Sequence, residues 1–545
     1  MPHSSTATNG PGNASAAPLH PDSASPFDVL LDAFRRNADR VALIDGDESI
    51  TYAQLLDKMF KMARALQRKG LRRGDGVAAI DDNTPGILLT YLATKLIGCY
   101  FVAVPAPAAA VEQLRILEFT GVSALVYEPS FSASRVTELA SRPTCPEPLS
   151  LGPGQVGTDL LALTEAQSAA PFQPLGRDDD FADVVLTGGS SGGKPKAAAY
   201  TFERVAELCR AWERISAMDT AEAAAFRAPD CRVLRVVRAT VSPGIAVLPT
   251  LLNGGTLLLQ TGFDAEATLR AIEQQRVTVL ALYPSHLYQL LDHPDTTRID
   301  RSSVRMVVYW GAPMSTARLK QAIDVFGPVM SQIYGQSETR MVSHLSPEDH
   351  ARGLEHPNLL RSVGRPRPGV EVEIRTATGE LAAPGEIGEI RVRNSYRMNR
   401  YWNEPALTAR TMVDGWSHTG DLAHQDADGY LYLADRLRDM VLVNAVNCYT
   451  VDIENVLTAH QAVRAACVVG LPDARTGEAV HAAVVRRAGA EVGAAELRRL
   501  VRDELGDYET PKSVLFVDEL PVTRAGKPDK NTVRDLVSAS LAQDG

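Results

Sequence analysis

The stretch TGGSSGGKPK, residues 187–196, follows an apolar run at residues 184–186 and indicates both a fold class and a ligand. Its glycines leave backbone N–H groups exposed, its hydroxyl groups add donors, and its two lysines add positive charge, which together favour a bound phosphate. In layered α/β proteins, ligands bind near the carboxyl ends of the strands. A mobile surface linker is the weaker interpretation, because lysines and hydroxyl groups are concentrated beside a buried strand.

The same stretch argues against a P-loop NTPase. Residues 188–194 match the G-x-x-x-x-G-K part of that motif, but Pro195 stands where a P-loop carries its magnesium-binding Ser or Thr. Another group must therefore hold any metal.

The composition of the 545-residue chain is that of a large globular protein. Hydrophobic residues make up 45% and charged residues 22%, enough to build several domain-sized units. The net charge of −10 disfavours binding to nucleic acid or to an anionic membrane. No apolar run reaches the roughly 18 residues of a membrane span, and six scattered cysteines without metal-ligand spacing favour reduced thiols in the cytoplasm.

The pattern of apolar residues predicts alternating strands and helices. Thr51 and Gln54 form a capping box after a predicted hairpin, and residues 277–283 are an apolar run typical of a buried parallel strand. We therefore predict an α/β fold with doubly wound sheets. Strands are expected at 41–44, 48–51, 77–80 and 99–104, and helices from 51 to near 70 and at 86–97.

Three changes of texture divide the chain. The first residues lack both a secretory pattern and apolar periodicity, which indicates a disordered tail. Strands and turns dominate from residue 364, and a compact α+β pattern follows residue 435. The expected units are a tail at 1–26, a large N-terminal domain at 27–435 whose residues 364–435 form a β-rich subdomain, and a small C-terminal domain at 436–545.

Five further motifs follow the loop in a fixed order. With the loop, they resemble the signatures of the adenylate-forming superfamily, which comprises acyl-CoA and aryl-CoA synthetases, nonribosomal-peptide adenylation domains and luciferases. The resemblance covers residues 28–535, and the chain is closest in character to a stand-alone acyl- or aryl-acid CoA ligase. The motifs are YWGAP at 309–313, IYGQSE at 333–338, WSHTGD at 416–421, DRLRD at 435–439 and PVTRAGK at 521–527.

The resemblance implies a role for each motif. Lys527 would bridge the substrate carboxylate and the α-phosphate, and Glu338 would hold Mg²⁺. Such positive charge is needed because a carboxylate is a poor electrophile and repels a triphosphate. The implied catalytic residues are Lys527, Glu338, Ser337 and Arg436. The implied nucleotide-binding residues are Thr187, Gly188, Gly189, Ser190, Ser191, Gly192, Lys196, Gly311, Ala312, Tyr334, Gly335, Asp421 and Arg436.

The family's C-terminal domain rotates between two half-reactions, so this chain is expected to do the same, with Arg438 at the hinge. The implied cofactors are ATP or acyl-AMP, Mg²⁺ and coenzyme A. Asn444 and Ala445 occupy the position of a Gly-Gly pair that lies along the CoA tunnel in CoA ligases, and both are small enough to leave the tunnel open.

The phosphate loop departs from the family's pattern. Gly193 and Lys194 stand where the family has a single residue, and Ala197 stands where many members have glycine. An extra residue displaces backbone donors, and one preorganised donor is worth on the order of 10² to 10³ in rate. This motivates the hypothesis that thioester formation from preformed acyl-AMP dominates over adenylation from ATP. A complete two-step ligase is the alternative, because Lys527 and Glu338 are both present.

The expected acyl pocket is mostly apolar, which suits a bulky aryl, terpenoid or fatty acid. Val241, Tyr283, His286 and Trp310 are its candidate residues, with His286 expected as a wall residue rather than a base. The aromatic residue and histidine that many members place near residues 238–244 are both missing. No Asp follows an aromatic residue in 233–247, which disfavours an amino acid substrate.

Two alternatives to a CoA ligase stay open. One is a ligase that loads a carrier protein acting in trans, because the same adenylate serves either thiol. The other is a non-catalytic protein that binds an acyl-adenylate. The expected partners are a small carboxylic acid or its adenylate and CoA, with a homodimer left open and neither nucleic acid nor a membrane expected.

Overall fold

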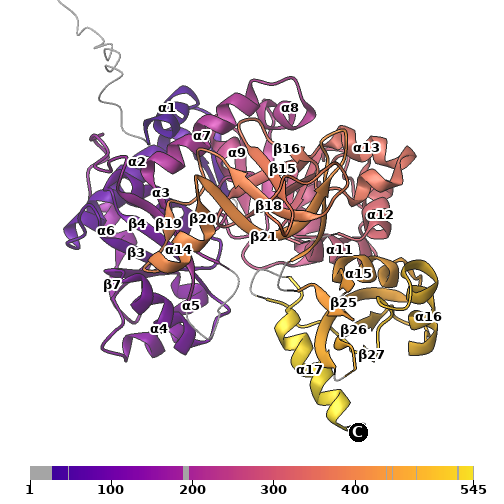
Figure 1. The fold of residues 1–545 in the computed structure, drawn as a ribbon. Helices are drawn as coiled ribbons and strands as arrows, with labels where there is room; N and C mark the ends of the chain where they lie inside the picture. Colours follow the sequence, from indigo (N-terminus) through magenta and orange to yellow (C-terminus); the bar gives the residue numbers. More distant parts are fainter. Residues whose placement is uncertain are drawn as a thin grey trace, which may run out of the picture.

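The structure is a computed structural model that describes residues 27–46, 48–187, 195–312, 314–436, 439–444, 446–473, 475–523 and 527–543. The predicted tail at 1–26 lies outside these residues. Four sheets organise the described chain, of nine, eight, five and five strands. The first three build a large N-terminal part, and the last belongs to a smaller C-terminal unit that lies beneath it in Figure 1. The fold class is therefore α/β, as predicted.

The nine-stranded sheet is parallel through its middle and antiparallel at its edges. Its strands in spatial order are β16 (Arg365–Pro366), β15 (Arg340–Leu345), β14 (Met330–Gln336), β13 (Met306–Trp310), β12 (Val279–Leu282), β10 (Arg232–Arg235), β11 (Thr256–Leu259), β1 (Val41–Asp45) and β2 (Glu48–Thr51). Every residue of β12 and β13 is buried. The prediction of a buried parallel strand within 277–283 is confirmed, and so is the hairpin of β1 and β2.

The eight-stranded sheet has the same character. Its parallel strands end in β8, which leads into the glycine-rich loop, and β9 returns antiparallel from that loop. In spatial order the strands are β19 (Arg400–Tyr401), β9 (Ala197–Thr201), β8 (Phe181–Leu186), β4 (Tyr100–Pro105), β3 (Gly76–Asp81), β5 (Ala124–Tyr127), β6 (Glu147–Ser150) and β7 (Thr158–Asp159).

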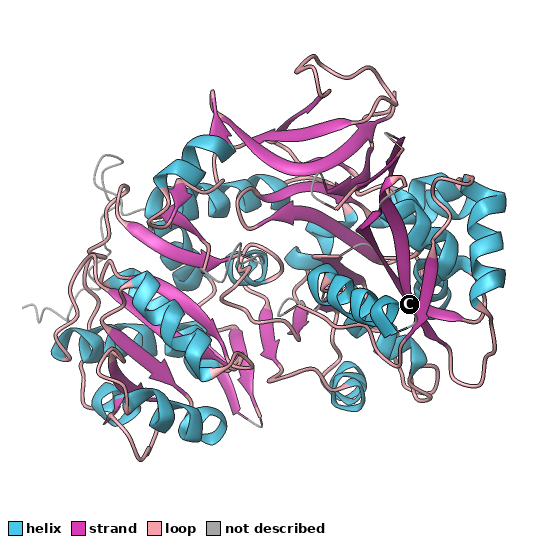
Figure 2. Cartoon of the chain, turned by 60° about the horizontal axis from the view of Figure 1, so that its bottom comes forward, coloured by secondary structure: helices cyan, strands magenta, loops and turns pink. Residues whose placement is uncertain are grey.

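Helices lie alongside the strands of both large sheets (Figure 2). The predicted capping box at Thr51 and Gln54 is present and opens α2. One hydrophobic core joins α2 and α3 to strands of both sheets, because the apolar faces of these helices have a sheet on each side. The helices are α1 (Asp28–Arg36), α2 (Tyr52–Arg68), α3 (Pro85–Leu96), α4 (Ala110–Thr120), α5 (Pro129–Ala140), α6 (Leu160–Glu165), α7 (Phe202–Ser216), α8 (Ala221–Arg227), α9 (Val247–Asn253), α10 (Ala265–Gln274), α11 (Pro284–Asp292), α12 (Thr316–Phe326), α13 (Pro347–Glu355), the 3₁₀ helix η3 (Pro357–Arg361) and α14 (Pro405–Thr411).

The third sheet is antiparallel and lies within the segment where strands and turns were expected. It contains β17 (Glu371–Arg375), β18 (Gly388–Arg393), β20 (Met412–Val413), β21 (Trp416–Gln425) and β22 (Leu431–Arg436). Two short strands of the same segment, β16 and β19, pair instead with the two large sheets. The segment is therefore joined by backbone hydrogen bonds to both halves of the N-terminal part.

The C-terminal unit is built on the fourth sheet, which carries its own core of Val, Ile and Leu side chains. Its elements are β23 (Val441–Val443), β24 (Val446–Cys448), α15 (Thr450–Ala459), β25 (Val463–Asp473), β26 (Gly477–Arg486), α16 (Ala494–Leu505), β27 (Ser513–Phe516) and α17 (Lys530–Gln543). The sequence pattern did not predict α17. All six cysteines are free, and no helix of the described residues has the length and apolar character to cross a membrane.

Candidate active site

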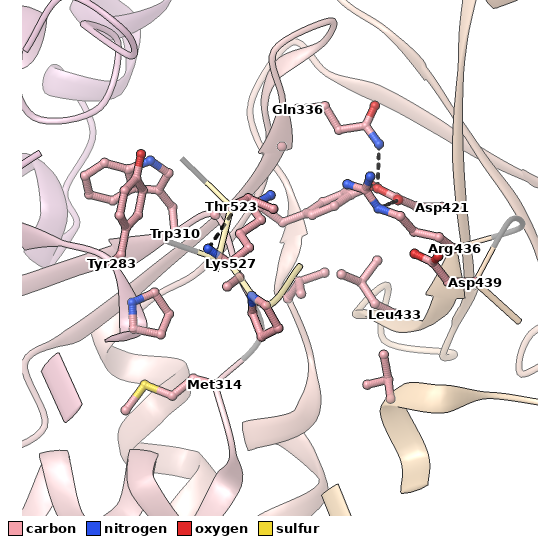
Figure 3. A pocket seen from close by; sticks show the side chains of 18 of the residues that line it. Tyr283, Trp310, Met314, Gln336, Asp421, Leu433, Arg436, Asp439, Thr523 and Lys527 are labelled. Atoms are coloured by element: carbon pink, nitrogen blue, oxygen red, sulfur yellow. Dashed lines mark hydrogen bonds and ion pairs between the residues drawn. The ribbon is translucent and has the colours of Figure 1, made fainter. Parts of the chain in front are cut away.

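A cavity of about 2450 Å³ lies between the N-terminal part and the C-terminal unit. Figure 3 shows side chains from both parts facing one another across it. The cavity brings together fourteen of the predicted site residues from motifs spread over more than 300 positions of the sequence. They are Thr187, Lys196, Val241, Tyr283, Trp310, Gly311, Ala312, Tyr334, Gly335, Ser337, Glu338, Asp421, Arg436 and Lys527.

Asp421 on β21 is the centre of a polar network. Its Oδ2 accepts hydrogen bonds from Oη of Tyr334 at 2.7 Å and from Nε2 of Gln336 at 2.6 Å. Its Oδ1 lies 3.2 Å from Nε of Arg436, the residue paired with it in register on β22. Burial, followed by the nearby Asp421 charge, raises the pKa of Tyr334, so the phenol stays protonated and donates. The network fixes an acidic side chain at one end of the cavity (Figure 3).

Glu338 lies in the turn between β14 and β15, and its carboxylate contacts Lys196 at the base of the glycine-rich loop. Its Oε1 accepts a hydrogen bond from Oη of Tyr401 at 2.7 Å and lies 3.1 Å from Nζ of Lys196. That ammonium group also lies 4.3 Å from the centre of the Tyr401 ring. Burial raises the pKa of Tyr401, and the adjacent Glu338 carboxylate adds to the effect. Sequence reasoning missed Tyr401, because no motif marks a residue that joins the site from β19.

Glu338 suits a magnesium ion that is shared with a nucleotide. Mg²⁺ is usually bound by one or two carboxylates together with substrate phosphates. Within the described ranges no three His, Cys, Asp or Glu side chains are grouped for a metal. A site with one carboxylate therefore fits a metal that arrives with ATP, and Glu338 is the residue that would hold it.

The base of the glycine-rich loop is closed by backbone contacts. The amide of Thr187 donates to the carbonyl of Lys196 at 2.8 Å, next to the pairing of Leu186 with Ala197. Gly188, Gly189, Ser190, Ser191 and Gly192 lie in 188–194, outside the described residues, as do the inserted Gly193 and Lys194. Thr187 and Lys196, the two ends of the loop, are hydrogen-bonded to each other, and the Lys196 side chain contacts Glu338.

A buried ion network includes a residue of β8, the strand that precedes the loop, and was not predicted. Nζ of Lys95 lies 2.7 Å from Oδ1 of Asp183 on β8, and both side chains are almost fully buried. Arg340, the first residue of β15, lies 3.4 Å from Oδ2 of the same carboxylate and 3.8 Å from the centre of the Tyr200 ring. Asp183 thus ties the strand before the phosphate loop to the strand after Glu338.

The turn that presents Ser337 and Glu338 requires a glycine at its start. A Cβ at Gly335 would stand 1.8 Å from the carbonyl oxygen of Arg340, where the β14–β15 register shifts. The missing side chain lets the two strands close and directs Glu338 toward Lys196. Ser337 lines the cavity beside it.

Lys527 reaches the cavity from the C-terminal unit. A Cβ at Gly311, whose φ is +90°, would stand 3.8 Å from Cε of Lys527 and 3.2 Å from the ring of Tyr283. The Lys527 backbone is anchored at both of its polar groups: its amide donates to Oγ1 of Thr523 and its carbonyl accepts from the Thr523 amide. The Lys527 side chain therefore lies beside Gly311, just after the end of β13, and Tyr283 lies close to the same glycine (Figure 3).

Tyr283 and Trp310 form an aromatic wall of the expected acyl pocket, with ring centres 5.2 Å apart. Val241 and Met314 complete it as apolar lining. His286 is absent from the described lining of the cavity. Its ring stacks on Phe263 with a centre distance of 4.4 Å, and burial lowers its pKa to about 4, so a neutral packed ring explains its position.

Arg235 is a fully buried cation next to this wall, and no motif in the sequence marks it. Its guanidinium donates to the carbonyls of Ile245, Arg238 and Ser242 and to Oγ of Ser242, and it lies 5.1 Å from the centre of the Trp310 ring. Burial lowers its pKa to about 10, which leaves it charged at neutral pH. Arg235 thus holds the loop between β10 and α9 in place.

The predicted hinge and tunnel residues are placed only in part. Arg438 and Ala445 lie outside the described residues. Asn444 is exposed, has a φ of +50° and donates its backbone N–H to Thr476, and it does not belong to the described lining of the cavity. Asn is among the few non-glycine residues that tolerate this backbone conformation.

The two-part fold and the cavity between the parts define an adenylate-forming enzyme. A sequence model of the AMP-binding enzyme family matches residues 30–402, and one of the AMP-binding enzyme C-terminal domain matches residues 452–527. The chain belongs to the AMP-binding enzyme family.

Similar proteins differ in the acceptor that their names imply. The medium/long-chain-fatty-acid–CoA ligase FadD8 of Mycobacterium tuberculosis is 34% identical over 93% of this chain and 89% of its own length. The feruloyl-CoA synthase of an Amycolatopsis species is 33% identical over 92% and 96%. The amide bond synthetase McbA of Marinactinospora thermotolerans is a solved structure with a TM-score of 0.83 and 39% identity, covering 93% of this chain and 99% of its own.

Proposed function

We propose that this protein is an acid–CoA ligase that activates a bulky apolar carboxylic acid with ATP and passes the acyl group to the thiol of coenzyme A. The observation that carries the proposal is the position of Lys527 beside Gly311 and Tyr283. This lysine brings a positive charge to the point where the expected acyl pocket meets the nucleotide-binding residues.

In the first step, a carboxylate oxygen of the acid attacks the α-phosphorus of ATP, and the bond to pyrophosphate breaks. Lys527 would offset the repulsion between the two anions as they meet. Asp421, Tyr334 and Arg436 would hold the ribose and adenine. Mg²⁺ held by Glu338 would neutralise charge on the departing pyrophosphate.

In the second step, the thiol sulfur attacks the carbonyl carbon, the bond to AMP breaks and the thiol proton is lost. Lys527 occupies the cavity in this structure, whereas Asn444 stands outside it. A rotation of the C-terminal unit about the hinge at Arg438, which the family resemblance implies, would withdraw Lys527 from the cavity and bring Asn444 to it.

An amine is the second candidate acceptor. McbA, whose name states amide bond formation, has 39% identity to this chain, above the 34% of FadD8. Asn444 also stands where the family resemblance expects a glycine along the pantetheine arm. An amine would attack the same carbonyl carbon and release the same AMP, so only the second step differs.

The inserted residue in the glycine-rich loop is expected to affect the first reaction step. The described base of the loop is closed by Thr187 and Lys196, and Lys196 is tied to Glu338. We propose that the inserted residue weakens adenylation from ATP more than it weakens transfer from preformed acyl-AMP. Because its six cysteines are free, we also propose a reducing compartment, the cytoplasm, as its location.

Two assays test these proposals. Acid-dependent exchange of labelled pyrophosphate into ATP, across a panel of aryl, terpenoid and fatty acids, reports the first step. Robust exchange would support the ligase and overturn the loop hypothesis, and its loss in Lys527→Met would tie it to this site. The second assay supplies acyl-AMP with CoA, a phosphopantetheinyl carrier protein or an amine. If only the amine yields an acylated product, the CoA proposal is overturned. If none of the three acceptors causes AMP to be released, acyl transfer itself is overturned.

A further inference from the structure

Arg238 is a half-buried arginine in the lining of the cavity. Its Nη1 is buried and has no hydrogen-bond partner, and its guanidinium forms no ion pair with any residue that the structure describes. By contrast, Arg340 is paired with Asp183 and Arg436 with Asp421. Arg238 is therefore a cation in the wall of the site whose guanidinium has no acceptor among the residues that the structure describes.

The carboxylates near Arg238 are already engaged. Asp81 accepts from Oγ1 of Thr240 and from the backbone of Asn83, and Asp82 accepts from Oγ of Ser132 at 2.7 Å. Asp183, which lines a small side cavity together with Arg238, is held by Lys95. The Arg238 charge acts on Asp82, but none of these carboxylates forms an ion pair or hydrogen bond with the guanidinium.

The side chain of Arg238 lies at the acyl side of the cavity, with its Nη1 shielded in the wall. Arg238 lines the cavity with Val241 and Tyr283, and its charge acts on the Tyr283 hydroxyl, whose pKa is raised mainly by burial. Arg235 holds the Arg238 carbonyl at 3.2 Å, so the backbone at this position is fixed. The result is a fork of guanidinium donors on a fixed backbone beside apolar walls.

A buried donor without a partner is destabilising, and a guanidinium prefers oxygen acceptors that it can bind in pairs. The reacting carboxylate already has a cation, because Lys527 reaches it from the C-terminal unit. A second acceptor on the substrate would use the fork of Arg238 without competing with Lys527.

We propose that Arg238 is a specificity residue that selects acids carrying a second oxygen acceptor, a carboxylate or a carbonyl group, on an otherwise apolar body. This inference rests on the proposed function, because it assigns the body of the acid to the pocket of Val241, Tyr283 and Trp310. It narrows the substrate class from apolar acids to apolar acids with one distal polar group.

The test compares matched ligands that need no turnover. Hydrolysis-resistant acyl sulfamates of adenosine are prepared from three acids of equal length that end in a methyl, a keto or a carboxylate group. Calorimetry then gives Kd for the wild type, Arg238→Met and the exposed control Arg270→Met, which loses only a surface pair with Glu266. We expect the oxygenated ligands to bind the wild type at least about tenfold more tightly than the methyl ligand. Arg238→Met should lose this preference and Arg270→Met should keep it.

Three outcomes would overturn the inference. Equal binding of all three ligands to the wild type would remove the selectivity while leaving the proposed function intact. Equal weakening of all three by Arg238→Met would assign the residue to the reacting carboxyl or phosphate group. Binding of none of them would contradict the proposed function itself. Thermal melting of Arg238→Met and Arg238→Lys checks folding, and the lysine variant should recover part of the preference for the carboxylate ligand.

Discussion

Asp435 near the end of β22 accepts two hydrogen bonds from Thr450, the first residue of α15: one from its backbone N–H at 2.6 Å and one from its hydroxyl at 2.8 Å. This contact joins the N-terminal part to the C-terminal unit. The neighbour of Asp435, Arg436, is paired with Asp421 in the cavity. The position of the C-terminal unit and that of an arginine in the cavity lining are therefore fixed by consecutive residues.

Replacing Asp435 by Asn should slow the first half-reaction. The carboxylate lies at the amino end of α15, where a negative charge is stabilised by the helix, and its hydrogen bonds are charge-assisted. We expect Asp435→Asn to lower acid-dependent pyrophosphate exchange by about tenfold, with little change in the Kd for preformed acyl-AMP.

Arg361 provides the matched control for this contact. Its pair with Asp452 also joins η3 to α15, at 2.6 Å, but both side chains are more than a third exposed. Exposed pairs contribute at most about 1 kcal/mol, so Arg361→Ala should change the exchange rate by less than about fivefold. An equal loss in both variants would contradict a special role for Asp435.

Glu338→Gln should cause a larger loss of exchange than Tyr401→Phe. The first change removes the charge that Lys196 and a metal would share, an effect on the order of 10² to 10³ in rate. The second removes one hydrogen bond to the same carboxylate, about tenfold. Initial rates measured against Mg²⁺ concentration check the order, and a chelator should stop exchange in the wild type. Near-normal exchange in Glu338→Gln would rule out the assigned role.

Gly311→Ala should damage activity more than stability. A Cβ there would stand 3.2 Å from the ring of Tyr283 and 3.8 Å from Cε of Lys527, so it would crowd the wall beside the lysine. The change also adds strain, because φ is +90°, on the order of 1 to 3 kcal/mol. Gly369→Ala is the control, since its φ is +78° and its Cβ would meet nothing within 4 Å. Both variants should melt at similarly lowered temperatures, but only Gly311→Ala should lose exchange activity, and equal activities would contradict the contact.

Acid should destabilise the fold through His350. Its ring is fully buried between Oη of Tyr309 at 2.9 Å and the carbonyl of Ser346 at 2.7 Å, and burial lowers its pKa to about 4 from the ordinary 6.5. Between these two values the unfolded chain binds a proton that the folded chain does not. The free energy of unfolding should therefore fall as the pH falls from 6.5 toward 4, by up to roughly 3 kcal/mol from this residue.

Urea unfolding at several pH values measures this slope. His350→Gln should flatten it, whereas replacement of the exposed His356 by Gln should leave it unchanged. His286, whose pKa burial also lowers to about 4, should maintain part of the slope in the variant. A slope of the opposite sign in this window would contradict the assignment.

The sequence predicted local features well where one physical signal dominated. The buried strand within 277–283 and the capping box at Thr51 are both present as expected. Each depends on residues that are neighbours in the sequence, so a local pattern is enough to predict it. Long-range polar contacts had no such signal. Arg235 and Asp183 follow ordinary strand patterns, and only the loops and strands that surround them show that their charges are buried.

The sequence by itself determined the family motifs, their order and most of the residues that line the cavity, because each motif combines residue types that one chemistry requires over a few positions. Tertiary structure decided which charges are neutralised. It brings Tyr401 from β19 to Glu338, commits Asp183 to Lys95 and leaves Arg238 in the cavity wall without an acceptor among the described residues. Ion pairing and the desolvation of charged side chains depend on groups that meet only when distant strands pack. The motifs therefore determine which residues line the site, and the packing determines its electrostatics.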